Sequence, residues 1–219
     1  HAKPTSGVLE LTYAARSMFT DSAEFKAQDT ETMEAGLIGF LNEGIHGWYE
    51  SVTDKPYVVD KSRGWGIHYD FLETFLEYEP KVICMVRDLR QIIASMEKKF
   101  RQNSLNHDPI VNWAEMSGTT VEKRADIWLR SQPVGLALER FGEIINRGWD
   151  KKMLFVKFED FTKTPGKEME KIYNYLDIDS YEHDFKNVVQ TTKEDDTVYG
   201  IYGDHKINPV VSELPQDYL

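Results

Sequence analysis

An arginine and a serine eight residues apart are the best candidates in this chain to hold a phosphate group. Arg87 follows a short apolar run, residues 81–86, which is rich in β-branched side chains and predicts a buried strand. Ser95 lies about two turns into the helix that we expect next. Ligands bind at the carboxyl ends of strands in open α/β sheets, and a forked guanidinium beside a hydroxyl suits a phosphate. The alternative is that Arg87 pairs with a carboxylate and Ser95 is an ordinary helix residue.

Lys61 is a second residue whose position suits chemistry on an anion. It follows a shorter apolar run, residues 57–59, which we also predict to be a buried strand. An ammonium group at a strand end can stabilise negative charge that develops on a leaving oxygen. The alternative is a solvated lysine in a loop.

Helices and one further strand must position these groups. We expect a third buried strand at residues 153–156, followed by Glu159 and Asp160. Apolar spacing predicts helices at residues 7–18, 31–49, 68–76, 89–101, 120–146 and 165–175, with Pro133 kinking or splitting the fifth. Short apolar strands that alternate with helices are typical of a parallel sheet in one α/β domain. The charged ends of the three strands should therefore gather along one edge of that sheet.

Length, charge and cysteine content narrow the class of protein. The 219 residues suffice for a single domain with a sizeable core, and they contain no evident repeat or linker. The net charge of −11 argues against a nucleic-acid partner, because nucleic acids are themselves negatively charged. A highly sulfated polymer is a less favourable partner for the same reason. The single cysteine, Cys84, cannot form an intramolecular disulfide, which fits a reducing cytoplasm. No apolar run approaches the roughly 18 residues of a membrane span, and no metal-ligand spacing is present.

Three segments follow one another along the chain: Val59-Asp60-Lys61-Ser62, then Cys84-Met85-Val86-Arg87-Asp88 with Ser95, and then Phe155-Val156-Lys157-Phe158-Glu159-Asp160-Phe161 with Pro165. Taken together in this order, they resemble the sulfotransferase family. The resemblance covers residues 57–179 and looks closest to the tyrosylprotein-sulfotransferase-like and the bacterial or phage-type branches. It implies a P-loop NTPase-like sulfotransferase fold, a three-layer α/β domain whose parallel sheet is flanked by helices. It also implies transfer of a sulfuryl group from 3′-phosphoadenosine-5′-phosphosulfate (PAPS) to a hydroxyl or amine, without a metal.

The same resemblance implies roles for individual residues. Arg87 and Ser95 match the family residues that bind the 3′-phosphate of PAPS. Lys99 stands where some relatives carry a basic residue to the same phosphate. Lys61 matches a lysine that assists the departure of the 5′-phosphate.

Transfer to a hydroxyl also needs a group that takes its proton. We take His68 as the candidate catalytic base, because it follows Lys61 within about two helical turns. A histidine near Trp65 and Tyr69 is more often simply packed or at the surface. The other candidates for the base are His46, Glu10 and Asp60.

The chain departs from the family in one respect. Relatives begin with a strand and a glycine-rich turn whose backbone N–H groups cradle the 5′-phosphosulfate, and no such turn is evident in this sequence. We expect the chain to be a fragment that lacks this first strand and turn, with truncation at the C-terminal end also open. The alternative is a natural variant that no longer turns over PAPS.

A long loop and a late aromatic segment are candidates to complete the site. Residues 102–119 are a candidate to line the acceptor site, because long loops in compact domains are often functional. The late segment is a candidate to close over the nucleotide through Tyr199, Tyr202, His205 and Lys206.

The acceptor and two other functions stay open at this point. The acceptor is a hydroxyl of a small molecule, a peptide or a glycan. One alternative function is a nucleotide or sugar kinase-like phosphotransferase, with Asp60 or Asp88 as the metal-binding carboxylate. The other is a non-catalytic nucleotide-binding or structural module derived from the sulfotransferase fold.

Overall fold

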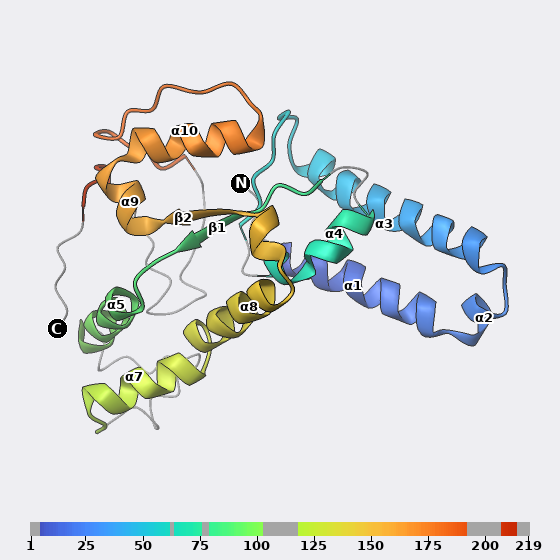
Figure 1. Ribbon diagram of the computed structural model, residues 1–219, viewed down its shortest axis with the longest axis horizontal. Coiled ribbons are helices and arrows are strands. Elements are labelled where there is room, and N and C mark those ends of the chain that lie inside the picture. Colours follow the sequence, from blue (N-terminus) through green and yellow to red (C-terminus); the bar gives the residue numbers. More distant parts are fainter. Residues whose placement is uncertain (1–4, 62–63, 76–78, 103–117, 192–206, 214–219) are drawn as a thin grey trace. The chain divides into compact units, whose positions relative to one another are not determined.

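The computed structural model describes residues 5–61, 64–75, 79–102, 118–191 and 207–213 (Figure 1). The chain divides into two compact units. The first is His1–Val82 with Arg140–Trp149, and the second is Ile83–Glu139 with Asp150–Leu219. Each unit has a hydrophobic core of its own. The prediction of a single domain stays a prediction.

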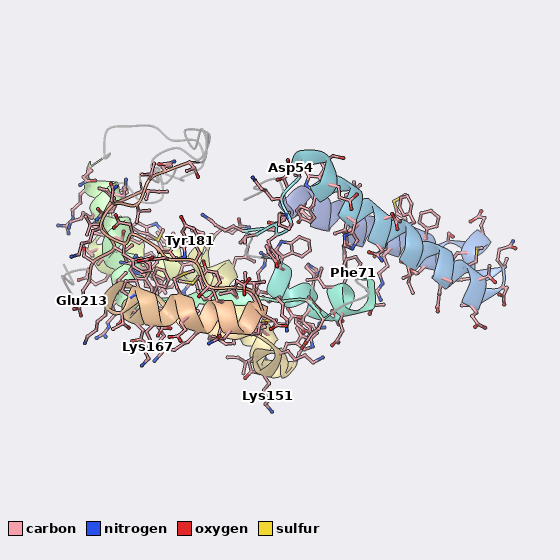
Figure 2. All side chains as sticks on the ribbon, turned by 90° about the horizontal axis from the view of Figure 1, so that it is seen from above. Asp54, Phe71, Lys151, Lys167, Tyr181 and Glu213 are labelled. Carbon is pink, nitrogen blue, oxygen red and sulfur yellow. The ribbon has the colours of Figure 1, made fainter. Side chains whose placement is uncertain are left out.

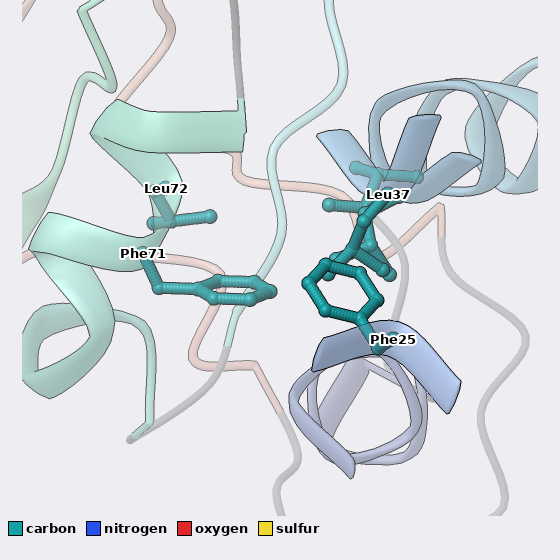
Figure 3. Close-up of a cluster of buried hydrophobic side chains, with 6 residues drawn as sticks. Phe25, Leu37, Phe71 and Leu72 are labelled. Carbon is teal, nitrogen blue, oxygen red and sulfur yellow. The ribbon is translucent and has the colours of Figure 1, made fainter. Parts of the chain in front are cut away.

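The first unit is helical in its described residues. Its elements are α1 (Thr5–Asp21), α2 (Ala23–Lys26), α3 (Thr30–Val52), the 3₁₀ helix η1 (Trp65–His68) and α4 (Tyr69–Phe75). α3 begins at a capping residue, Asp29, whose side chain accepts a hydrogen bond from the backbone N–H of Thr32 at 3.1 Å. Phe71, labelled in Figure 2, lies on α4. It is 2% exposed, and an apolar stripe along α3 packs in the same core. The core is made of Phe25, Leu37, Leu41, Ile45, Phe71 and Leu72 (Figure 3).

The helices predicted in this unit are confirmed, and the strand is not. His68 closes η1 and directly precedes α4 instead of opening one longer helix. Residues 57–59 do not form the buried strand that we predict, because the side chains of Tyr57 and Val59 are 66% and 63% exposed. The run has three residues, fewer than the roughly five of a usual strand, and the β-bridge in this segment falls on the next residue, Asp60.

The second unit contains a parallel pair of strands, β1 (Ile83–Val86) and β2 (Leu154–Lys157), drawn side by side in Figure 1. Ile83 lies opposite Leu154 and Val86 lies opposite Lys157, so both strands end at the same level. The helices are α5 (Leu89–Gln102), α7 (Val121–Arg130), α9 (Phe158–Lys163) and α10 (Pro165–Leu176). α8 (Val134–Asn146) and η2 (Trp149–Lys152) contribute residues to both units.

The sequence predicts most of this unit correctly. Both strands and their parallel pairing are confirmed. Pro133 separates α7 from α8, as its place in the predicted helix indicates, and the side chain of Thr120 caps α7. α5 and α7 pack around Met96, Phe100, Trp128 and Val134.

The two strands are covered unequally, which corrects one expectation. Val156 on β2 is 0% exposed, whereas its partner Met85 on β1 is 53% exposed, so β1 is not buried along its whole length. Cys84 on β1 is half-buried, and burial raises the pKa of its thiol. A helical chain with a small parallel sheet agrees with the α/β class, and the three-layer arrangement remains a prediction.

Candidate functional site

Arg87 lies where the sheet of the second unit ends. The last residue pair of the sheet joins Val86 to Lys157, and a helix follows each strand, α5 after β1 and α9 after β2. This level ending brings Arg87 against Phe158, with the guanidinium carbon 4.5 Å from the centre of the ring. The expectation that charged strand ends gather is therefore met for β1 and β2.

No carboxylate of the described residues forms an ion pair with Arg87. Its Nε donates to the neutral amide oxygen of Gln91 at 3.4 Å. The carboxylate of Asp88 accepts instead from Arg90, at 2.7 Å, and that of Glu159 accepts from the backbone N–H of Asp88, at 2.9 Å. A half-buried guanidinium that has no carboxylate partner among the described residues is suited to bidentate binding of a phosphate.

Ser95 and Lys99 continue a row that starts at Arg87. Gln91, Ser95 and Lys99 follow at intervals of four residues, and residues four apart lie on one face of a helix. Ser95 is exposed and Lys99 is half-buried. The row therefore offers a guanidinium, a hydroxyl and an ammonium, which together suit an anion.

α5 also carries a buried ion pair that the sequence patterns alone did not lead us to expect. Glu97 is 0% exposed, and it accepts hydrogen bonds from Arg124 of α7 and, at 2.7 Å, from Arg101. The hydrogen bonds from Arg124 are the main cause that lowers the pKa of Glu97, and Glu97 in turn raises the pKa of Arg124. A signal was present in the sequence, because Glu97 stands four residues after Ile93 within the apolar stripe of the helix.

Lys61 and His68, the predicted catalytic residues, belong to the first unit. Lys61 is exposed and follows Asp60, whose carboxylate accepts a hydrogen bond from the hydroxyl of Tyr49. Partial burial raises the pKa of Asp60, while the bond from Tyr49 opposes the shift. A common site of these residues with Arg87 stays a prediction, as do the roles of all five predicted site residues.

His68 is half-buried at the end of η1, with its ring centre 5.1 Å from that of Tyr13. Burial is the main cause that lowers its pKa, and the positive charge of Arg140 acts in the same direction. The imidazole is therefore neutral near neutral pH, which is the form that can accept a proton. The other candidate bases, His46, Glu10 and Asp60, belong to the same unit.

Some expectations fall outside the described residues. Residues 103–117 of the predicted acceptor loop lie there, and so do Tyr199, Tyr202, His205 and Lys206 of the late aromatic segment. Among the residues that are described, no group of three or more His, Cys, Asp or Glu could hold a metal ion. The helices of this part of the chain include none that is long and apolar enough to cross a membrane.

Comparison with known families now gives the class of protein. A family model described as a sulfotransferase domain matches residues 66–197, which is more than half of the chain. The chain belongs to this family. The match includes His68, Arg87, Ser95 and Lys99, and it begins after Lys61. No curated protein and no solved structure gives a significant match.

Proposed function

We propose that this sulfotransferase uses PAPS as its sulfuryl donor and that Arg87, Ser95 and Lys99 bind the 3′-phosphate. The observation that carries the proposal is the half-buried guanidinium of Arg87 at the carboxyl end of β1. It is held by a ring and an amide, and no carboxylate among the described residues neutralises it. Charge-assisted hydrogen bonds to a phosphate are the strong kind that such a group can form.

The reaction is an in-line displacement at sulfur. The acceptor oxygen or nitrogen forms the new bond to sulfur as the bond from sulfur to the oxygen of the 5′-phosphate breaks, and adenosine 3′,5′-bisphosphate leaves. Lys61 stabilises the charge that develops on the leaving phosphate, and His68 is the candidate base for the acceptor proton. No metal takes part in this proposal.

The acceptor class and the branch of the family belong to the proposal as well. A hydroxyl of a small molecule, a peptide or a glycan fits the expected chemistry, and the tyrosylprotein-sulfotransferase-like and bacterial or phage-type branches are those that the sequence resembles. The cytoplasmic location that the single cysteine suggests is a further part of the proposal.

Calorimetry with adenosine 3′,5′-bisphosphate in magnesium-free buffer tests the phosphate site. We expect Arg87→Ala to weaken binding by about 2–5 kcal/mol, and Ser95→Ala to weaken it less, because each variant removes a hydrogen bond to the charged phosphate. Arg90→Ala is the matched control, since Arg90 is more exposed and pairs with Asp88. An unchanged affinity in the Arg87 variant would remove the central residue of the proposal.

A second titration, with ATP in a buffer that contains magnesium, separates the two other functions. Tighter binding of ATP with magnesium than of the bisphosphate would favour a kinase-like phosphotransferase. Binding of neither nucleotide would favour a non-catalytic module.

Lys61→Ala tests the leaving-group role. We expect this variant to lower the rate of transfer more than it lowers the affinity for the bisphosphate, because the charge on the leaving oxygen develops only during the reaction. The measurement is single-turnover transfer beside calorimetry on the same sample. A normal rate would exclude Lys61 from the reaction.

A further inference from the structure

We propose that Glu159 is a positioning residue for Arg87, acting through the backbone N–H of Asp88. The inference rests on the proposed function, because it takes Arg87 as a ligand of the 3′-phosphate. It adds a residue from a different strand end, 71 positions along the chain from Asp88.

The bond from Asp88 to Glu159 extends the link between the two strands beyond the sheet. The last register pair joins Val86 and Lys157, so the chain from Arg87 onward has no further partner in the ladder. Glu159 Oε1 accepts from the backbone N–H of Asp88 at 2.9 Å. The backbone of Arg87 is therefore tied to β2 on both sides, by the ladder before it and by this carboxylate after it.

The side chain of Arg87 is then held by two neighbours. The ring of Phe158 lies 4.5 Å from its guanidinium carbon, and Gln91 accepts from its Nε at 3.4 Å. An arginine that is already ordered loses less conformational entropy when it binds a phosphate. Since Phe158 and Glu159 are consecutive residues, one turn after β2 fixes both the backbone and the side chain of Arg87.

Charge alone predicts the opposite effect of Glu159. A carboxylate near an anion site repels the anion, so its removal should tighten the binding of a phosphate. If Glu159 acts by holding Asp88 in place, its removal should weaken that binding. The two roles therefore differ in the sign of the effect.

The experiment measures a preference between two nucleotides. Calorimetry gives the dissociation constants of adenosine 3′,5′-bisphosphate and adenosine 5′-monophosphate, and their ratio isolates the contribution of the 3′-phosphate. We expect Glu159→Ala to lower this preference about tenfold, because a hydrogen bond to a charged group is removed. Glu159→Gln keeps an acceptor oxygen in the same place and should retain most of the preference.

Two further variants complete the design. Asp160→Ala is the charge-matched control, because Asp160 is the adjacent exposed carboxylate and its side chain has no hydrogen bond with the described residues. It should leave the preference unchanged. If Glu159→Ala does not fold, Glu159→Asp keeps the charge, shortens the reach by one methylene and should also lower the preference.

The possible results separate the two proposals. A wild-type chain with no preference for the bisphosphate would overturn the proposed function, and this inference with it. A wild-type preference that is unchanged or larger in Glu159→Ala would overturn the positioning role alone. A preference that falls in Glu159→Ala and returns in Glu159→Gln would support both.

Discussion

Two arginines of the second unit lie over phenylalanine rings at nearly the same distance, and their charges are used differently. The guanidinium carbon of Arg124 is 4.6 Å from the centre of the Phe100 ring, and that of Arg87 is 4.5 Å from the centre of the Phe158 ring. Arg124 is 8% exposed and donates to both carboxylate oxygens of Glu97. Arg87 donates to the neutral amide of Gln91.

The comparison shows that the carboxylate, and not the ring, separates the two roles. A cation over an aromatic ring contributes about 0.5–2 kcal/mol in either place, so the ring alone says little about function. The buried Glu97 neutralises Arg124 and makes it part of the core. No described carboxylate does so for Arg87, which leaves its charge for a ligand. Loss of the first arginine should therefore affect stability, and loss of the second should affect binding.

The largest expected effect is on folding. We expect Arg124→Ala to lower the free energy of unfolding by about 3–5 kcal/mol, because it leaves Glu97 buried without its main partner. Arg101→Ala removes the other partner of the same carboxylate, but Arg101 is largely exposed, so the expected loss is about 1 kcal/mol or less. Denaturant unfolding measures both variants. Similar losses in the two would show that burial does not distinguish the partners of Glu97.

Acid should weaken the same pair. Because Arg124 holds the pKa of Glu97 below its ordinary value of 4.5, the unfolded chain takes up this proton more readily than the folded one. The stability that Glu97 supplies is therefore fully present above about pH 4.5 and is lost as the pH falls toward the folded pKa. We expect wild type to be more stable than Glu97→Gln near neutral pH, with the difference shrinking in acid. Urea unfolding over a pH series measures it, and a constant difference would contradict the prediction.

The sequence predicts the local parts of the candidate site well. Apolar runs of four to six residues and a helical stripe are signals within one segment, so β1, β2 and α5 are found with boundaries close to those observed. The row from Arg87 to Lys99 follows from the same pattern. The parallel pairing follows from the helices between the two strands.

Contacts between distant segments are less visible in the sequence. Glu97 and Arg124 are 27 positions apart, and only the place of Glu97 in an apolar stripe indicates that a buried partner exists. The bond from Asp88 to Glu159 needs the strand register, which no local pattern supplies. The prediction of a buried strand at residues 57–59 is wrong because three apolar residues are too short a pattern to distinguish a buried strand from an exposed loop.

Arg87→Ala gives the other half of the comparison. We expect its free energy of unfolding to fall by about 2 kcal/mol or less, since the substitution removes only the packing on one ring and one long hydrogen bond to a neutral group. The main effect of the substitution should be the loss of bisphosphate binding. Unfolding and calorimetry on one preparation measure the two effects together. A loss of stability as large as that of Arg124→Ala would break the comparison, because Arg87 would then be a structural residue too.

The smallest effect on the stability of the folded chain should come from protonation of His68 in the first unit. Burial disfavours the positively charged form of this imidazole. Burial and the nearby charge of Arg140 lower the pKa of His68 below its ordinary value of 6.5, against weaker opposing effects of Asp70 and Glu143. The unfolded chain thus binds a proton first, and the stability tied to the neutral imidazole is lost as the pH falls below about 6.5. This window lies above that of Glu97, so the two effects can be separated.

Thermal unfolding between roughly pH 7.5 and pH 5.5 tests this difference. We expect the melting temperature of His68→Gln to fall less with acid than that of wild type in this range. The melting temperature of Arg140→Leu should show an intermediate dependence on pH, because this variant removes the second cause that lowers the pKa of His68. If the melting temperature of His68→Gln depended on pH as steeply as that of wild type, the imidazole would have equal proton affinity in the folded and unfolded chains. In that case its neutral state would owe nothing to the fold, and the reason to prefer it over the other candidate bases would be lost.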